Sequence, residues 1–479
     1  MRWIIPRSYR RLPVHGTAAG GTAHCRSHGD GTIAAQTRDA LKIKLPHPFI
    51  LLLGGVVIAA ALTWILPAGA YQRRADAATG RNVVVPGTYA RIDSAPVGPM
   101  AALLAVPRGI VAGADVILVV LFVGGAFALL DSTGALARLV GALVGRTGHP
   151  RLIVVLVSLA FATLGALENM QEEIIALVPV LLVLSRGLGF GPVTAVAMSL
   201  GAAAVGSAFG PTNPFQTGIA LRFSEMPALS QPILRFGLLI AALVVWIAWT
   251  VAMTSRDVGT PHTKSTAAPA ATARDGVLLA LVLVPFIPYV YGVLRYDWGF
   301  NELSALFLVA GFAVGLVAGR GLSDTAAGFL KGMEGVLAAA LFVGVARAIS
   351  VVLSDGQILD TILHSLASPL GGLPGLAAAM LMVPTHALLH VPVPSVSGHA
   401  VLTMPVMAPL CDLIGISRDA GVIAYQTGAG LSDMLIPSNG AVLAILLAAD
   451  VSYGRWIKFA VPGALLVSIV GLIGIALAR

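Results

Sequence analysis

The sequence predicts an all-α polytopic membrane protein: two inverted-topology repeats with about nine transmembrane helices, two re-entrant hairpins and two broken helices. Composition is the first reason, because 57% of the residues are hydrophobic, 11% are charged and the mean hydropathy is +0.89. Soluble domains are less apolar and about 25% charged. The second reason is a series of apolar stretches near the roughly 20 residues that cross a bilayer. The third is an internal repeat.

Two segments, 226 positions apart, match in register without a gap. The matching residues are Pro179 with Pro405, Gly189 with Gly415, and Pro211-Thr212-Asn213 with Pro437-Ser438-Asn439. Paired Gly/Pro interruptions of this kind indicate the binding site of a secondary transporter. A helix broken inside the membrane leaves N–H and C=O groups that only protein or a wet cavity can cover. We therefore expect these freed groups to bind substrate and ions.

The chain divides into four predicted regions. These are a basic arm (1–46), a first membrane repeat (47–255), a cytosolic loop with a linking helix (256–300) and an inverted second repeat (301–479). The arm shows no periodicity and is interpreted as a disordered cytosolic extension or a mis-assigned start, with lipid binding as the alternative. Its charge places the N-terminus in the cytoplasm of a bacterial inner-membrane protein. The net charge of +8 does not suggest nucleic-acid binding.

The first repeat begins with a span and ends with one. Its predicted elements are spans at 49–67 and 115–130, a surface helix at 135–144, a hairpin with arms at 152–167 and 174–185, a broken helix at 192–222 and a span at 236–254. The hairpin arms are too short to cross the bilayer comfortably, which favours a re-entrant loop. A solvated loop between two short spans is the alternative.

The second repeat follows a linking span at 277–294, which inverts it. Its predicted elements are spans at 303–319 and 336–353, a surface segment at 357–366, a hairpin at 373–411 with its tip at 390–399, a broken helix at 419–447 and a span at 456–477. This order mirrors the first repeat and puts the C-terminus outside.

Polar residues concentrate at the two tips and the two breaks, and ionisable groups inside membrane segments mark ion or substrate pathways. The candidate binding residues are Asn169, Glu172 and Glu173 at the first tip, Thr212, Asn213 and Thr217 at the first break, Ser395, Ser397, Gly398 and His399 at the second tip, and Thr427, Ser432, Asp433, Ser438 and Asn439 at the second break.

The chemistry of these side chains suits a small cation. Amide and hydroxyl oxygens with freed carbonyls are hard ligands, so Na⁺ at Asn213 and Asn439 is expected. Glu172 and Glu173 are adjacent and cannot both stay ionised cheaply, so H⁺ is the other candidate for the coupling ion. No further cofactor is expected. Asp433 is either a ligand or a structural acceptor, and Arg347 either pairs with an intramembrane carboxylate or snorkels.

Other classes of protein fit less well. His386 and His390 have a spacing found in zinc sites, but the catalytic Glu of the metalloprotease motif is absent and no third ligand is evident. An intramembrane hydrolase is therefore a remote alternative, and no transition metal or enzyme activity is expected. A channel is another, although channels favour a ring of repeated subunits.

Three motifs resemble the YfcC family, which is related to anaerobic C4-dicarboxylate carriers and arginine/ornithine antiporters. They are the segment 210–220 (GPTNPFQTGIA), the segment 397–415 (SGHAVLTMPVMAPLCDLIG) and the acidic pair Glu172-Glu173. The resemblance runs from about Pro46 to Arg479. It implies the ion transporter superfamily fold, with scaffold and transport domains, a small-molecule substrate and often a homodimer in the lipid bilayer.

Two departures from that family stand out. Gly428-Ala429-Gly430 replaces a usual Gly-Asp-Gly, with Asp433 one turn further on, and His399 ends a tip that usually ends in Gln. The predicted function is secondary active transport of a small metabolite, by ion coupling or exchange with alternating access. A basic amino acid is favoured for its match to the acidic tip. The alternative is a C4-dicarboxylate, held by Arg347, hydroxyls and helix N-termini.

Overall fold

A computed structural model describes all but a few parts of the chain. The described residues are 48–75, 82–146, 149–227, 229–254, 271–296 and 298–478. They fall in one compact unit, Leu45–Arg479. The predicted basic arm at 1–46 and most of the predicted cytosolic loop lie outside the described residues.

The first half of the described chain is mainly helical. Its elements are α1 (Pro48–Ile65), β1 (Gly69–Ala70), β2 (Arg73–Ala75), β3 (Asn82–Val84), β4 (Ala90–Arg91), α2 (Pro99–Ala112), α3 (Ala114–Ser132), α4 (Ala135–Arg146), α5 (Pro150–Glu168), α6 (Ile174–Gly187), α7 (Pro192–Val196), η1 (Ala197–Gly201), α8 (Ala202–Phe209), η2 (Pro214–Gly218), α9 (Ile219–Phe223) and α10 (Pro232–Thr254). The strands pair as two short antiparallel ladders, β1 with β4 and β2 with β3.

The second half contains helices alone among its described residues. Its elements are α11 (Ala273–Leu283), α12 (Phe286–Tyr296), α13 (Phe300–Val317), α14 (Leu322–Asp355), α15 (Leu359–Ala367), η3 (Ser368–Gly372), α16 (Gly375–His390), α17 (Val396–Leu413), α18 (Arg418–Tyr425), η4 (Gln426–Gly430), α19 (Gly440–Ala448) and α20 (Tyr453–Leu477).

Length and composition make this a membrane fold. Eight helical segments of the described residues are long and apolar enough to cross a bilayer, and two of them are the predicted hairpin arms α5 and α17. Large apolar side chains face outward on other helices, as with Trp64 on the shorter apolar helix α1, Ile233 on α10 and Leu465 on α20. Outward apolar faces of this extent suit contact with lipid. The predicted all-α polytopic class is confirmed.

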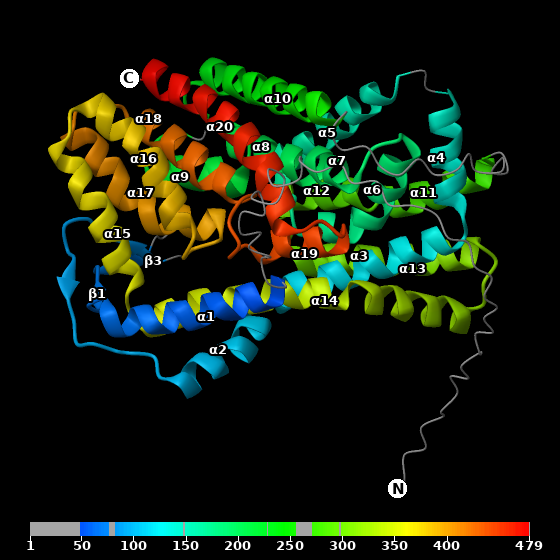
Figure 1. Ribbon diagram of the computed structural model, residues 1–479, viewed down its shortest axis with the longest axis horizontal. Coiled ribbons are helices and arrows are strands. Elements are labelled where there is room, and N and C mark those ends of the chain that lie inside the picture. The colour runs from blue at the N-terminus through cyan, green and yellow to red at the C-terminus, as the bar shows by residue number, and fades with distance from the viewer. Residues whose placement is uncertain are drawn as a thin grey trace, which may run out of the picture. The chain divides into compact units, whose positions relative to one another are not determined.

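The same order of elements occurs twice. A hairpin (α5–α6) is followed by a broken helix (α7 to α9) and a closing helix (α10), and this order recurs as α16–α17, α18 to α19, and α20. The repeated glycines end equivalent hairpin arms, with φ of +83° at Gly189 and +73° at Gly415. Only glycine adopts this conformation freely, which explains why the repeat preserves it. In Figure 1, α16 and α17 lie on the left and α6 on the right. The orientation in the bilayer stays a prediction.

Helix α14 is the longest helix of the described residues, and α1, α2, α3 and α13 pack along it (Figure 1). Small residues allow close approach, since a Cβ added to Gly109 would lie 2.6 Å from the backbone of Gly344 and of Ala348. The same helix touches the second broken helix, because a Cβ on Gly440 would lie 2.6 Å from Val343 Cα. Hence α14 connects α1, α2, α3 and α13 to α19 of the second broken helix.

Several predicted boundaries differ from the structure. The linking span at 277–294 is divided into α11 and α12 just before Pro285, which supplies no N–H to continue the first helix. Helix α14 begins at Leu322, well before the predicted span at 336–353. Charged Lys331 and Glu334 end the apolar window there, but they do not end the helix. The second tip is residues 391–395 alone, so His390 and His399 lie in the helical arms. The stretch before α3 also contains α2, which was not predicted.

Candidate functional site

Both breaks are restarted by the repeated asparagine. Asn213 Oδ1 accepts the N–H groups of Phe215 and Gln216 at 2.9 and 2.8 Å, and Asn439 Oδ1 accepts those of Ala441 and Val442 at 2.9 and 3.3 Å. Asparagine is among the best residues for this capping role. Because both amide oxygens are already engaged, the observed role of each asparagine is a helix cap, and a Na⁺ site on them stays a prediction.

An uncharged network surrounds the first break. Asn213 Nδ2 donates to Gly165 O at 2.8 Å and to Ser207 Oγ at 3.3 Å. The Ser207 hydroxyl in turn contacts Asn169 Oδ1 and lies 3.0 Å from Gln216 Oε1, either of which can accept its proton. Asn169 ends α5 with a left-handed φ of 60°, a conformation that asparagine tolerates better than most residues. The first tip and the first break are therefore joined through neutral side chains.

A second network ties the two breaks together. Gln426 Nε2 donates to Ala208 O and Thr217 Oγ1, both at 2.8 Å. Its Oε1 accepts from Arg235 Nη1 at 2.7 Å, and Arg235 Nη2 donates to Asp419 Oδ1 at 2.7 Å. Arg235 and Asp419 are both buried, so this ion pair requires the hydrogen bonds that surround it. Helices α10 and α18 are thereby joined to both breaks.

Asp433 is the point where the first tip and helix α16 of the second hairpin meet the second break. Gln171 Nε2 of the first tip donates to Asp433 Oδ2 at 2.6 Å. Asn439 Nδ2 donates to Oδ1 at 2.8 Å, and His390 Nε2 lies 2.9 Å from the same oxygen. The carboxylate is only 4% exposed. Its two oxygens thus receive three hydrogen bonds from three separate elements.

Three buried imidazoles lead away from Asp433. His390 Nδ1 lies 3.4 Å from His399 Nδ1, and His399 Nε2 lies 2.9 Å from His386 Nδ1. The Tyr425 ring packs against both His386 and His399, and its hydroxyl donates to Val396 O at 2.7 Å. The sequence showed His386 and His390 as neighbours, but His399 joins them only because α17 folds back on α16. No group of three metal-binding side chains is arranged to hold a metal ion in the described part of the chain.

The structure separates the predicted site residues into two groups. Asn169, Asn213, Thr217, His399, Asp433 and Asn439 belong to the networks above. Most of the others serve local structure or face outward: Thr427 donates to its own helix, Ser395 caps α17, and Thr212 is exposed. Ser438 donates to Val391 O and so joins the second break to the second tip. Ser397 and Gly398 are partly buried, and Ser432 is 9% exposed. Gln171, His386, His390 and Gln426 were missed as site residues.

The altered glycine motif lies in η4. Gly428 and Gly430 pack against Val383 O and the Gln216 side chain so closely that a Cβ on either would collide. Ala429 is fully buried, and the Asp433 N–H donates to Ala429 O at 3.1 Å. Asp433 therefore supplies a carboxylate one turn beyond the position where the resemblance leads one to expect it.

Sequence comparison now decides the family. The model of the DcuC family, described as C4-dicarboxylate anaerobic carriers, matches residues 45–479. The chain belongs to this carrier family. An uncharacterized protein of Haemophilus influenzae is 27% identical over 481 residues, covering 87% of this chain and 93% of the relative. The putative basic amino acid antiporter YfcC of Escherichia coli is 26% identical over 466 residues, covering 86% of this chain and 92% of the relative.

Two solved structures are also similar. MtrF of Neisseria gonorrhoeae, described in terms of antimetabolite efflux pumps, has 15% identity and a TM-score of 0.41, covering 91% of this chain and 95% of that chain. The YdaH transporter of Alcanivorax borkumensis has 16% identity and a TM-score of 0.42, covering 90% and 98%. The family assignment makes this carrier a multi-pass secondary transporter with a small-molecule substrate, and not an enzyme. The predicted resemblance is confirmed.

Opposite charges lie where the first tip of the carrier approaches α14. Glu172 is partly buried, Glu173 is buried, and the charges of Asp433, Arg347 and Asp115 all act on Glu172. Arg347 is exposed on α14 and lies against Gly113, where an added Cβ would be 3.2 Å from its Cδ. Arg347 forms no salt bridge among the described residues. Glu172 at the first tip and Arg347 on α14 are therefore the oppositely charged pair considered for substrate binding.

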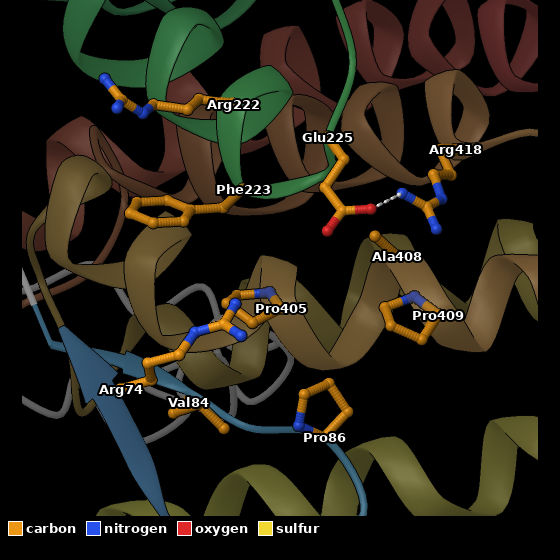
Figure 2. Close-up of a pocket in the computed structure, with 10 residues that line it drawn as sticks. All are labelled: Arg74, Val84, Pro86, Arg222, Phe223, Glu225, Pro405, Ala408, Pro409 and Arg418. Carbon is orange, nitrogen blue, oxygen red and sulfur yellow. Dashed lines mark hydrogen bonds and ion pairs between the residues drawn. The ribbon is translucent and has the colours of Figure 1, made fainter. Parts of the chain in front are cut away.

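A separate pocket of about 180 Å³ lies between α9, α17 and the β2–β3 ladder. Figure 2 shows Glu225 and Arg418 directed toward one another across one side of it, at 3.0 Å. Arg418 also pairs with Asp412 at 2.7 Å. None of the predicted site residues lines this pocket, so it is distinct from the centre at Asp433.

Proposed function

We propose that this carrier moves a basic amino acid across the bacterial inner membrane, by exchange or ion coupling with alternating access. The observation that carries the proposal is the set of three carboxylates, Glu172, Glu173 and Asp433, around the contact between the first tip and the second break. Carboxylates held inside a membrane protein favour a cationic ligand. The printed name of YfcC, a putative basic amino acid antiporter, agrees with that charge.

The three carboxylates have different tasks in this proposal. Asp433 already receives hydrogen bonds from Gln171, His390 and Asn439, so its charge serves the protein itself. Glu172 is the more accessible member of the acidic pair and is the group proposed to bind the substrate cation. Arg347 then faces the α-carboxylate, which gives the site one charge for each end of an amino acid.

The test is arginine uptake into proteoliposomes loaded with ornithine. Exchange should proceed with the wild type and fall by about 10-fold or more with Glu172→Gln, since a hydrogen bond to a charged group is worth about 1.5–3 kcal/mol. Glu334→Gln is the matched control, because Glu334 is exposed on α14 and far along the helix from Arg347. Absence of arginine exchange, or an unchanged rate with Glu172→Gln, would contradict the proposal.

A C4-dicarboxylate is the second candidate substrate. The family description names this class, and Arg347 is exposed and free of any salt bridge in the described part of the chain. Arginine side chains bind carboxylates through two parallel hydrogen bonds. Succinate uptake that is lost in Arg347→Gln but kept in Glu172→Gln would favour this candidate over a basic amino acid.

A homodimer stays an expectation carried by the family resemblance.

A further inference from the structure

We propose that His386, His399 and His390 form a proton relay that ends on Asp433, and that H⁺ is the coupling ion of this carrier. The inference rests on the chain being a secondary transporter and is independent of which substrate it carries. The three imidazoles lie in a row inside the second hairpin, and the sequence motifs did not reveal this arrangement.

The hydrogen-bond geometry has a single direction when all three imidazoles are neutral. His390 donates its Nε2–H to Asp433 at 2.9 Å, which leaves Nδ1 as an acceptor. His399 donates its Nδ1–H to that nitrogen at 3.4 Å, and His386 donates its Nδ1–H to His399 Nε2 at 2.9 Å. Each neutral imidazole has one donor and one acceptor, so every nitrogen but one is used.

The remaining nitrogen is His386 Nε2. It is buried and has no hydrogen-bond partner among the described residues. Buried polar atoms are normally paired, and an unpaired one calls for an explanation. An open lone pair at the far end of an otherwise satisfied chain is what a proton acceptor requires.

The proton movement balances along this chain. One proton binds His386 Nε2, and the Nδ1 proton of His386 passes to His399 Nε2. The Nδ1 proton of His399 passes to His390 Nδ1, and the Nε2 proton of His390 passes to Asp433 Oδ1. One proton has entered and one carboxylate has become a carboxylic acid, while each imidazole is again neutral with its other nitrogen protonated. Ring reorientation or return of the proton restores the first state.

Few other groups compete for this proton. In the described part of the chain, the ionisable side chains that touch the three imidazoles are one another, Tyr425 and Asp433. The Tyr425 hydroxyl is already donated to Val396 O. On the neighbouring elements, Asp360 of α15 pairs with Arg73, Asp412 of α17 with Arg418, and Asp419 of α18 with Arg235. Another charged side chain at this point of the first tip is Glu172, which interacts electrostatically with Asp433.

Protonation of Asp433 would act on the first tip and on the second hairpin at once. Gln171 of the first tip donates to Asp433 Oδ2, and this bond is charge-assisted only while the carboxylate is ionised. Adding the proton weakens the contact between the first tip and the second break, and it reverses the donor and acceptor at His390. The relay thereby connects proton binding to the contact between the first tip and the second break.

The test reads Asp433 directly and needs no substrate. Infrared difference spectra of the full chain in lipid, recorded across about pH 5–8, the range in which imidazoles titrate, should show a carboxylic-acid C=O band. That band should be absent in Asp433→Asn. Its midpoint should move by about one pH unit or more in His399→Gln, which restores the family's usual tip residue. His364→Gln is the matched control, since His364 contacts Tyr71 outside the relay.

The outcomes separate this inference from the substrate proposal. A band assigned to Asp433 that shifts in His399→Gln but not in His364→Gln supports the relay, even if arginine is not transported. Arginine exchange with no titrating Asp433 band, or with a midpoint that His399→Gln leaves in place, would overturn the relay and leave the substrate proposal intact. Thermal unfolding of each variant verifies that the fold is retained.

Discussion

The two broken helices are both restarted by an asparagine cap, but the side chains around the two caps differ in charge. The shift of 226 positions that carries Asn213 onto Asn439 also carries Ser207 onto Asp433 and Glu173 onto His399. Ser207 and Asp433 both receive the amide N–H of their capping asparagine, at 3.3 and 2.8 Å. The first half therefore has a hydroxyl where the second half has a carboxylate.

This difference separates what the fold needs from what transport needs. Restarting a helix after a break requires the asparagine cap, and both halves have it. A neutral network of Asn169, Ser207 and Gln216 is enough to hold the first break. Only the second break carries an ionisable centre, and only there do the first tip and helix α16 of the second hairpin converge. We infer that the first break acts mainly as a structural joint and the second as the coupling site.

The largest effect is expected from removing the charge at the equivalent positions. Asp433→Asn should reduce transport about 100-fold, because it removes a buried negative charge that accepts hydrogen bonds from three partners. Ser207→Ala removes only neutral hydrogen bonds and should reduce transport less than about 10-fold. Initial uptake rates at equal protein density measure both. Equal losses in the two variants would remove the asymmetry between the halves.

The capping asparagines should have the next largest effect, and it should be on stability in both halves. Asn213→Ala and Asn439→Ala should each lower the free energy of unfolding by about 1–2 kcal/mol, since each helix loses its cap. Only Asn439→Ala also removes a donor to Asp433, so only this variant should change the pH dependence of transport. Thermal unfolding and a pH series of uptake rates test the pair. A changed pH profile in Asn213→Ala would contradict the comparison.

The repeated glycines should have smaller and equal effects. Gly189→Ala and Gly415→Ala each place a Cβ at a positive φ, which costs about 1 kcal/mol. Neither glycine has an atom within 4 Å of an added Cβ, so the backbone conformation alone sets the cost. Parallel thermal unfolding of the two variants measures it. A large difference between them would mean that the two hairpin ends are not equivalent.

The smallest effect is expected at Ser395. Its hydroxyl accepts the Gly398 N–H at 3.3 Å at an exposed position, so Ser395→Ala should lower stability by about 0.5 kcal/mol. Transport should change little, although the sequence placed Ser395 among the binding residues. A loss of uptake comparable with that of Asp433→Asn would restore Ser395 to the site.

Much of the fold could be predicted from local patterns. Hydropathy located the spans because each apolar run must face lipid or other apolar helices, and the paired Pro-[Ser/Thr]-Asn motifs located both breaks. The division of the linking span and the early start of α14 were not predicted, because helix hydrogen bonds do not depend on hydropathy. The tip at 390–399 was set too wide for the same reason, since polar His390 and His399 still continue their helices.

The candidate site was predicted only in outline. Asp433 and His399 were identified because an ionisable side chain in an apolar segment needs a reason. Gln171 was passed over, although it donates to Asp433 from 262 positions away. The sequence of this carrier by itself determined the membrane fold, the repeat and the two asparagine caps, since these follow from neighbouring residues. Only the packing of the two hairpins against the second break decided that Gln171 and His390 would share the Asp433 carboxylate. The same packing decided that three imidazoles would line up behind it.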